Sequence, residues 1–387
     1  SPYFLPGSGE VAKQAASSEL QSGAGRPHTH PVTPLQLRMR SMRVSLTVSR
    51  RLASGLLCIA ALGAIQSSAF GQGCVIARGG GGAMISDASG FLEPKQWQIT
   101  VAHRWFESDR HFIGDDEQKQ RKAQGTQVIN NSHFLDVTAT YAWSKRLNIN
   151  LTVPFVKHDR SSKYEHSGNA NPRYHTQSSG LADMRLSANY WVLNPEEHHR
   201  GNFAVGLGLK APTGSYTAKD VFIRPAGPQV RYVDSSIQPG DGGWGWTIEG
   251  QGYYHLVGNF TAYGNAFYLF NPRERVPQTN FSVPDAYMAR GGVEMAVTSV
   301  EGLAVSLGLR IEGVPGNDAF GGNRGSRRPG FSTAVEPGIT FSKGRFTGTF
   351  TIPVAIHHRR SHTFGSLRPG DAAFADFTVN TSLSWRL

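Results

Sequence analysis

A set of charged and imidazole side chains falls on the polar positions of segments in which apolar and polar residues alternate. The set comprises Arg104, Asp136, Asp183, Arg185, Lys210, Glu249, His255, Arg290, Glu294, Arg310, Glu312, Glu336, Asp376 and Arg386. Because successive side chains of a β-strand point to opposite faces, the alternation would gather these groups on one face of a sheet. Such a face could hold structural cross-strand ion pairs, or it could line a watery path that sorts solutes by sign and size. Both signs are present, so we expect no strong ion selectivity.

The clearest alternating stretch, His133–Lys157, indicates which elements would position these side chains. Apolar residues stand at odd positions from Leu135 to Trp143 and again from Leu147 to Phe155. The short polar segment 144–146 separates the two arms, so the stretch predicts an antiparallel hairpin. Each arm is about ten residues long, which is the length that crosses a bilayer when a strand is tilted. A soluble sandwich can show the same alternation, but a run of such long strands would be unusual there.

The rest of the chain repeats this pattern, and we predict about twelve strands in all. Besides the two arms of the hairpin, the expected strands are Gln96–Phe106, Gly180–Leu193, Asn202–Ala211, Gly243–Val257, Phe260–Phe270, Tyr287–Thr298, Leu303–Gly313, Phe331–Phe341, Phe346–His357 and Phe374–Leu387. Trp191 falls on the polar phase of its strand, so a β-bulge could occur near the end of that strand.

The connections between the expected strands alternate in length. Short ones such as 258–259 and 342–345 take turns with long polar ones such as 107–132 and 212–242. Short turns at one end and long loops at the other are typical of outer-membrane barrels. We therefore predict an all-β fold, a single antiparallel up-and-down transmembrane β-barrel with long extracellular loops and short periplasmic turns. Unpaired charges in a dry interior cost roughly several kcal/mol each, so its lumen must be watery or laced with ion pairs.

The first part of the chain has the features of a targeting segment. We expect residues 1–38 to be a disordered or spurious upstream extension, with Met39 or Met42 as the true start. Residues 39–71 have the features of a secretory signal peptide, with arginines before an apolar core at Leu52–Ile65 and small residues near the cleavage site. Residues 72–95 form a Gly-rich periplasmic lead-in, or a segment that tucks into the lumen. The barrel would then occupy residues 96–387.

Composition narrows the function classes. The net charge of +11 would suit nucleic-acid binding, but the basic residues are scattered, and several lie in the region expected to be removed. We therefore expect no nucleic-acid partner. Cys58 lies inside the apolar core of the signal peptide, which leaves Cys74 alone and excludes an intramolecular disulfide or a cysteine-based zinc site in the mature chain.

Three consecutive segments resemble a known family. They are Leu147–Phe155, Gly180–Leu193 and Phe203–Tyr216. Within them Val153-Pro154-Phe155, Gly180…Asp183 and Pro212-Thr213-Gly214 are similar to the strand-end, strand-start and post-strand motifs of the bacterial outer-membrane family named for the meta-pathway of phenol degradation. Ala182 stands where a second glycine is usual, and Leu387 stands where a terminal aromatic is commoner. The resemblance implies an outer-membrane, transporter-like barrel that passes or binds small, often aromatic, compounds.

Together these features predict an outer-membrane channel for small, aromatic or hydrophobic solutes. Its other partners would be outer-membrane lipid, lipopolysaccharide and the barrel-insertion machinery, and we expect no cofactor. Two rival classes remain open. One is an outer-membrane lipase or protease with a rim site, for which Ser361-His362 is a candidate. The other is a structural or adhesive barrel that acts through loops such as Val221–Gly240.

Four smaller clusters have both a functional and an ordinary interpretation. The His198-His199 pair, and His357-His358 with His362, could bind a transition metal, although surface histidines are commoner. The acidic run 115–117 could hold calcium or bridge lipopolysaccharide phosphates, although a solvated loop is commoner. Arg324, Arg327 and Arg328 could contact lipid phosphates, because the guanidinium fork binds them well.

Overall fold

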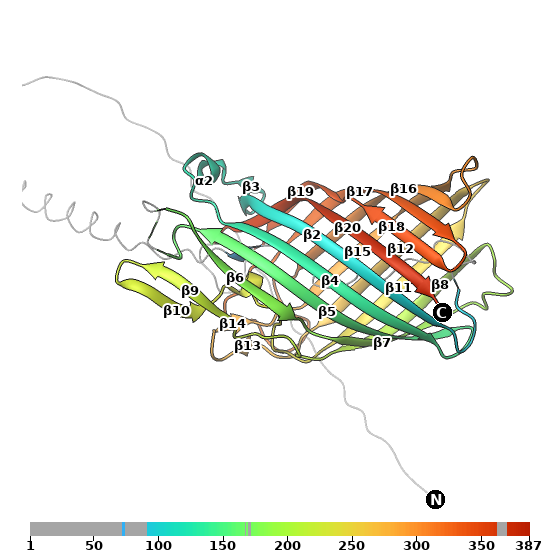
Figure 1. Ribbon diagram of the computed structural model, residues 1–387, viewed down its shortest axis with the longest axis horizontal. Helices are drawn as coiled ribbons and strands as arrows, with labels where there is room; N and C mark the ends of the chain where they lie inside the picture. The colour runs from blue at the N-terminus through green and yellow to red at the C-terminus, as the bar shows by residue number, and fades with distance from the viewer. Residues whose placement is uncertain (1–71, 74–90, 167, 169–171, 362–369) are drawn as a thin grey trace, which may run out of the picture. The chain divides into compact units, whose positions relative to one another are not determined.

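The computed structural model describes residues 72–73, 91–166, 168, 172–361 and 370–387, which all belong to a compact unit that runs from Ser67 to Leu387. The described residues of this unit form a closed antiparallel β-barrel (Figure 1). Helical structure in them is confined to α2 (Lys119–Ala123) and the 3-10 turn η2 (Ser235–Ile237). Among the described residues, no helix is both long and apolar enough to span a membrane.

The barrel wall contains twelve strands, two of which are interrupted. The segments are β2 (Trp97–Ile113), β4 (Ile129–Ala142), β5 (Leu147–Ser162), β6 (Tyr174–Leu181), β7 (Arg185–Trp191), β8 (Gly201–Lys210), β11 (Gly245–His255), β12 (Phe260–Phe270), β15 (Ala286–Ala296), β16 (Leu303–Val314), β17 (Gly330–Lys343), β18 (Phe346–Thr351), β19 (Val354–Arg360) and β20 (Ala372–Arg386). Strands β6 and β7 pair with successive parts of β5, and β18 and β19 pair with successive parts of β17. Pairing of β20 with β2, from Gln98–Arg386 to Phe112–Ala372, closes the barrel.

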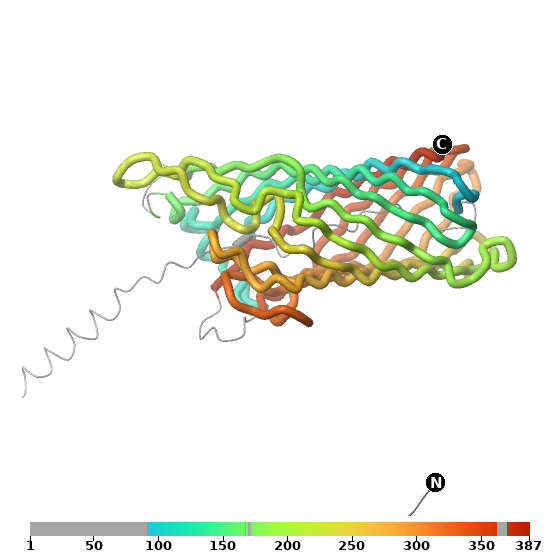
Figure 2. Tube along the Cα trace, turned by 90° about the horizontal axis from the view of Figure 1, so that it is seen from below, coloured from blue at the N-terminus to red at the C-terminus, as the bar shows by residue number. Residues whose placement is uncertain are grey.

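The two ends of the barrel differ in the length of their connections. One end carries short links such as 143–146 and 344–345, together with the C-terminus, and we call it the short-turn end. The other end, the long-loop end, carries β3 (Asp116–Glu117), β9 (Lys219–Arg224), β10 (Gly227–Tyr232), β13 (Arg275–Val276) and β14 (Phe281–Ser282). Figure 2 shows the yellow β9–β10 hairpin projecting beyond the wall at this end. Here too β1 (Gln72–Gly73) pairs in parallel with Ala372 and Ala373 of β20.

The predicted strands all occur in the barrel wall, and Phe260–Phe270 has the predicted bounds. Several extend further into the long-loop end than predicted: β2 continues to Ile113, β5 continues to Ser162, and β6 begins at Tyr174. In these extensions the backbone hydrogen bonds between strands continue, although apolar and polar residues no longer alternate. The bulge considered at Trp191 does not occur, because the β7–β8 register runs unshifted through Trp191 and Ala204. Trp191 points inward and is buried.

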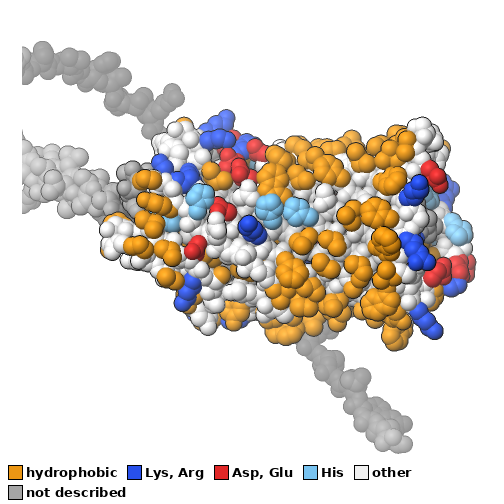
Figure 3. All heavy atoms as spheres, in the orientation of Figure 1, with side chains coloured by type: hydrophobic (Ala, Val, Ile, Leu, Met, Phe, Trp, Pro, Cys, Tyr) orange, Lys and Arg blue, Asp and Glu red, His pale blue; other side chains and the backbone are white. Residues whose placement is uncertain are grey.

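Apolar side chains lie on the outside of this barrel and polar ones on the inside. Leu207, Leu307 and Leu383 are 64%, 61% and 53% exposed, and hydrophobic side chains cover much of the wall in Figure 3. By contrast, Thr100 and Asn148 are buried inside. A contiguous apolar surface of this extent is unusual for a monomer in water and suits a lipid environment.

We predict that Leu307→Arg, on the outer wall, destabilises the barrel by about 2–4 kcal/mol in lipid, because charge on the lipid face is costly near the bilayer midplane. Val300→Arg is the matched control: Val300 is exposed in a short turn, where the cost near the interface is about 0–1 kcal/mol. Urea unfolding in vesicles measures both values. Equal stabilities of the two variants would contradict a lipid-facing wall.

Candidate functional site

The interior of the barrel is divided along its axis into three levels, which can be followed along β2. Thr100 lines a cavity toward the short-turn end, Arg104 forms an ion pair, and Phe106 lines a second cavity toward the long-loop end. These side chains share a face because they are separated by even numbers of residues. We call the three levels the polar chamber, the charged layer and the apolar chamber.

The polar chamber is a cavity of about 150 Å³. Its walls include Thr138, Thr140, Asn148, Asn150, Thr152 and Ser187. Several of these side chains bond to one another across strands: the hydroxyls of Thr138 and Thr152 lie 2.9 Å apart, and Thr140 donates to Asn150 over 2.8 Å. A polar cavity of this size has room for several ordered waters or for a small molecule.

The apolar chamber has a volume of about 140 Å³ and lies beneath the long loops. Its apolar walls include Phe106, Phe134, Leu269, Val276, Phe281 and Val314, and polar loop residues such as Gln238, Asp241 and Arg328 complete the lining. Aromatic stacking holds part of this lining, since the rings of Phe106 and Phe134 lie 5.7 Å apart. The lining suits an apolar ring or a short hydrocarbon chain.

The charged layer between the chambers is a chain of side chains of alternating charge. Arg104 donates to Glu312 over 2.8 Å and Arg310 donates to Glu312 over 2.9 Å. Arg310 and Arg290 approach Glu336 at 3.6 and 2.8 Å. Arg104 belongs to β2 and Glu312 to β16, which are separated in the sheet by β20, β19 and β17. Their ion pair therefore crosses the lumen and narrows it.

Burial explains why these charges form a continuous chain. Glu336 is 1% exposed and Glu312 is 5% exposed, so each carboxylate has lost nearly all contact with solvent. A buried charge needs an opposite charge and hydrogen bonds to offset its desolvation, and removing one partner typically costs about 3–5 kcal/mol. Two arginines beside each glutamate supply those partners.

The three motif segments of the family resemblance meet at the interruption between β6 and β7. Thr213 donates to the carbonyl of Ala182 over 2.7 Å and accepts from the amide of Met184 over 2.9 Å. The carboxylate of Asp183 accepts from the amides of Gly214 and Asp241, both at 3.0 Å. Lys210 pairs with Asp241 and lies 3.7 Å from Asp183. Asp183 thus anchors both ends of the 211–244 loop to the wall.

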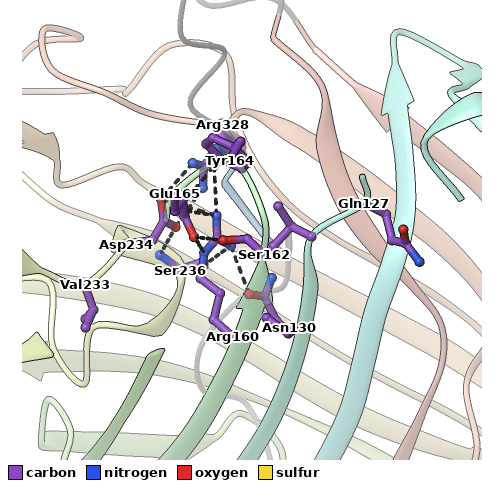
Figure 4. A network of polar contacts seen from close by, with 12 residues as sticks. Gln127, Asn130, Arg160, Ser162, Tyr164, Glu165, Val233, Asp234, Ser236 and Arg328 are labelled. Carbon is purple, nitrogen blue, oxygen red and sulfur yellow. Dashed lines mark hydrogen bonds and ion pairs between the residues drawn. The ribbon is translucent and has the colours of Figure 1, made fainter. Parts of the chain in front are cut away.

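A second polar network joins the long loops above the apolar chamber, and Figure 4 shows it from close by. Arg160 of β5 is fully buried and donates to Glu165 and Asn130, both at 2.9 Å. Arg328 donates to both carboxylate oxygens of Asp234, at 3.0 and 2.9 Å. The network ties Glu165, Asp234 and Arg328, which lie in three different loops, to the wall, and we call it the loop latch.

The ionisation of Asp234, a loop residue, determines the charge balance of the loop latch. Burial by itself would raise the pKa of this carboxyl, but the positive charges of Arg160 and Arg328 outweigh burial and hold the pKa below its usual range. A lowered pKa means that the ionised carboxylate stabilises the folded loops above about pH 4. That contribution is lost as the pH falls through the folded-state pKa.

The predicted inward residues are found at several places in the structure. Asp136, Arg185 and Glu249 face the polar chamber, whereas Arg104, Arg290, Arg310, Glu312 and Glu336 make the charged layer, and Asp183 and Lys210 hold the loop anchor. Toward the short-turn end, His255 bonds to Thr261 at 2.8 Å and Arg386 donates to the carbonyl of Gly344 at 3.1 Å. Glu294 stands opposite Ser306 in the β15–β16 register.

Asp376 departs from the expected inward phase. Its side chain is 51% exposed and pairs with Arg110 at 2.7 Å. The β2–β20 register shifts between Phe106 and Ser108, where β20 advances by one residue more than β2. This bulge turns Asp376 outward beside Phe377.

The arginines considered for lipid phosphates also differ from expectation. Arg327 is buried against Asp318 and Ser282, and Arg328 is buried in the loop latch. Both line the apolar chamber instead of facing outward. Arg324 is exposed but pairs with Glu274 at 2.7 Å. Two of the three guanidinium groups therefore bind loop carboxylates inside the protein.

The remaining sequence clusters have the following surroundings. Asp115 lies 3.4 Å from His357 and 3.3 Å from Arg359, and Glu117 pairs with Arg110. His358 is buried between the rings of Phe112 and Phe374. In the described part of the chain, no three His, Cys, Asp or Glu residues are arranged to hold a metal ion. His362, and with it the Ser361-His362 candidate, lies outside the described residues, as do Cys74 and the expected signal peptide.

The segment before β2 contributes to the interior at the short-turn end. Leu92 lines the polar chamber. Phe91 packs edge-on against Trp191, with ring centroids 4.6 Å apart, and also contacts Tyr253. Residues 74–90 of the expected lead-in lie outside the described residues. Inside the barrel, Phe91 gives the inward-facing Trp191 an apolar partner.

Sequence reasoning missed the functional parts that come from loops. Asp234 and Asp241 hold the loops over the lumen, yet they lie in segments that have no two-residue period, and Arg328 was considered only as a contact to lipid phosphates. Phe106 and Phe134 were also missed as chamber walls. Both stand at inward-facing positions of their strands, where polar residues are usual. An aromatic residue at such a position could have indicated an apolar part of the lumen.

Comparison with known proteins gives the class of the fold. No family model matches the chain, and no curated protein matches it. Among solved structures, it is similar to the COG4313 outer membrane channel from Pseudomonas putida F1, with a TM-score of 0.52 and 14% identity over 80% of this chain and 100% of that one. The P. putida toluene transporter TodX also matches, at a TM-score of 0.39 and 8% identity over 82% of this chain and 98% of that one.

The chain therefore has the fold of an outer-membrane channel barrel, with twelve antiparallel strands. The likeness at 14% identity concerns the fold alone. Membership of the meta-pathway family stays a prediction.

We predict that Asp234→Asn loosens the loop latch, because it leaves the buried Arg328 without its carboxylate partner at a cost of about 3–5 kcal/mol. Arg328→Gln should loosen it less, because Arg160 remains 3.8 Å from Asp234. Limited proteolysis of the folded barrel should then cleave the long loops faster, while heat-modifiable migration of the wall persists. Lowering the pH of the wild type through the depressed folded-state pKa of Asp234 should have the same effect, because the carboxylate becomes protonated there.

The matched control for this prediction is Arg324→Gln, which removes an exposed ion pair with Glu274. Exposed pairs contribute about 0–1 kcal/mol, so its cleavage rate should stay near that of the wild type. Cleavage of all three variants at the same rate would show that the Asp234–Arg328 pair does not hold the loops.

Proposed function

We propose that the chain is an outer-membrane channel of a Gram-negative bacterium that passes small hydrophobic or aromatic solutes through its lumen. The observation that carries the proposal is the stacking of two solute-sized chambers along the axis of a barrel whose outer wall is apolar. The apolar chamber lies beneath the long loops, which face outward in outer-membrane barrels. A solute would meet it first and the polar chamber second.

Further features of the proposal follow from the sequence. A signal peptide would direct the chain to the periplasm, and the barrel-insertion machinery would fold it into lipid and lipopolysaccharide. The resemblance to the meta-pathway family favours small aromatic compounds as solutes. The COG4313 protein is a channel, and the TodX protein is a toluene transporter, which is the same broad class of function. In this proposal the barrel moves solutes and is neither an enzyme nor an adhesin.

The direct test is reconstitution of the purified barrel. Planar bilayers should show stepwise currents, and liposomes should take up small aromatic solutes faster than protein-free liposomes. Absence of both would defeat the channel proposal. Hydrolysis of lipid or protein by the same preparation would favour an enzyme instead.

We predict that Arg104→Gln increases the single-channel conductance several-fold, because it removes the ion pair that crosses the lumen from β2 to β16. Glu312 keeps Arg310 as a partner, so the variant should still fold. The control is Arg110→Gln, which removes ion pairs of a half-buried side chain outside the charged layer. Unchanged conductance in Arg104→Gln would place the conducting path elsewhere.

A further inference from the structure

Three charged side chains of the polar chamber differ from the charges of the charged layer in their ion pairing. Asp136, Arg185 and Glu249 all line this cavity. Arg104, Arg290, Arg310, Glu312 and Glu336 have ion-pair partners in the charged layer, but none of these three forms an ion pair with another described residue. Asp136 lies within electrostatic reach of Arg185 and Arg104 but forms no direct contact with them, so its carboxylate can accept a hydrogen bond from a molecule in the chamber.

The strand register explains why Asp136 has no protein donor beside it. Its cross-strand neighbour on β5 is Pro154, which has neither an N–H group nor a polar side chain to offer. Arg185 on β7 is opposite Thr152, and the hydroxyl of Thr152 already bonds to Thr138. Strand β5 thus lies between the carboxylate and the guanidinium.

Glu249 is held in place on the other side of the chamber. Its carboxylate accepts a hydrogen bond of 2.9 Å from the hydroxyl of Thr247. Glycines in the adjacent strand β8 leave space for these side chains. A Cβ on Gly208 would lie 2.4 Å from the Thr247 hydroxyl and 3.3 Å from Glu249, and a Cβ on Gly206 would lie 1.7 Å from the side-chain oxygen of Asn189.

The balance of the three charges decides which polar group the chamber attracts. Two carboxylates and one guanidinium leave a net negative charge in a cavity whose other walls are largely neutral amides and hydroxyls. In a partly desolvated site such charges act more strongly than in water, and hydrogen bonds to ionised groups are the strong ones. The field therefore favours hydrogen-bond donors and cations over carboxylates.

We propose that the polar chamber binds the polar end of small amphipathic solutes that carry a protonated amine or a hydroxyl group, and that it discriminates against carboxylates. Asp136 and Glu249 receive the donor group, and Arg185 limits the excess of negative charge. The apolar part of the solute packs against Leu92 and Phe267, which line the same chamber. This inference deepens the proposed channel function by naming its solute class, and it rests on that function.

The test uses three probes with the same ring: benzylammonium, benzyl alcohol and benzoate. Isothermal titration calorimetry on the folded full-length barrel in detergent measures binding, and block of the potassium chloride current in planar bilayers measures access from solution. Wild-type protein should bind benzylammonium and benzyl alcohol more tightly than benzoate. Asp136→Asn and Glu249→Gln should each weaken benzylammonium binding by about tenfold, as expected for one charge-assisted hydrogen bond.

Arg185→Gln should have the opposite effect, with tighter benzylammonium binding and still weaker benzoate binding. The matched control is Asp376→Asn, an acid-to-amide change on the outside of the barrel, which should leave all three affinities unchanged. If Asp136→Asn does not fold, Glu249→Gln and the wild-type order of the probes still decide the question.

The outcomes separate this inference from the proposed function. Equal or tighter binding of benzoate, or no change in Asp136→Asn and Glu249→Gln, would overturn the inference even if the protein conducts. Absence of current together with selective benzylammonium binding would overturn the channel and keep the site.

Discussion

The hydrogen-bond ladder between β2 and β20 is the interaction on which the rest of the structure depends. It joins the first and last strands of the wall, from Gln98–Arg386 to Phe112–Ala372. Closure leaves the wall without an unpaired edge, and lipid accepts only structures whose backbone groups are paired internally. Once the sheet is closed, every strand must present one face to the outside and the other to the lumen.

Closure also dictates how the interior is stabilised. Many apolar side chains lie on the outside, where Leu207, Leu307 and Leu383 are exposed, so polar contacts hold much of the interior beside a few buried aromatic clusters. Buried charges must then pair, and the chain from Arg104 through Glu312, Arg310 and Glu336 to Arg290 is the result. This layer separates an apolar chamber from a polar one.

The long loops depend on the wall for their position. Asp183 binds the amides of Gly214 and Asp241, and the Asp234–Arg328 pair links two loops next to Arg160 of β5. The motif segments that resemble the meta-pathway family thus have a mechanical role here. The break between β6 and β7 frees Asp183 from the ladder so that its carboxylate can hold the loop.

The sequence by itself determined the strand set, the alternation of short and long connections and the inward phase of most lumen charges. These depend on a two-residue period that side-chain geometry imposes on any strand. Phe260–Phe270 was predicted with its final bounds, because its apolar pattern ends where the ladder ends. The local pattern was sufficient to predict a strand wherever one face of that strand meets a uniform apolar environment.

Only the tertiary structure decided which charges pair with which. Arg104 and Glu312 lie on strands separated by three others, so their contact depends on barrel curvature, which no local pattern encodes. The bulge in β20 that exposes Asp376, and the loop residues Asp234 and Arg328, depend in the same way on long-range register and packing. An ion pair needs a distance of a few ångströms, and that distance exists only after the barrel has closed.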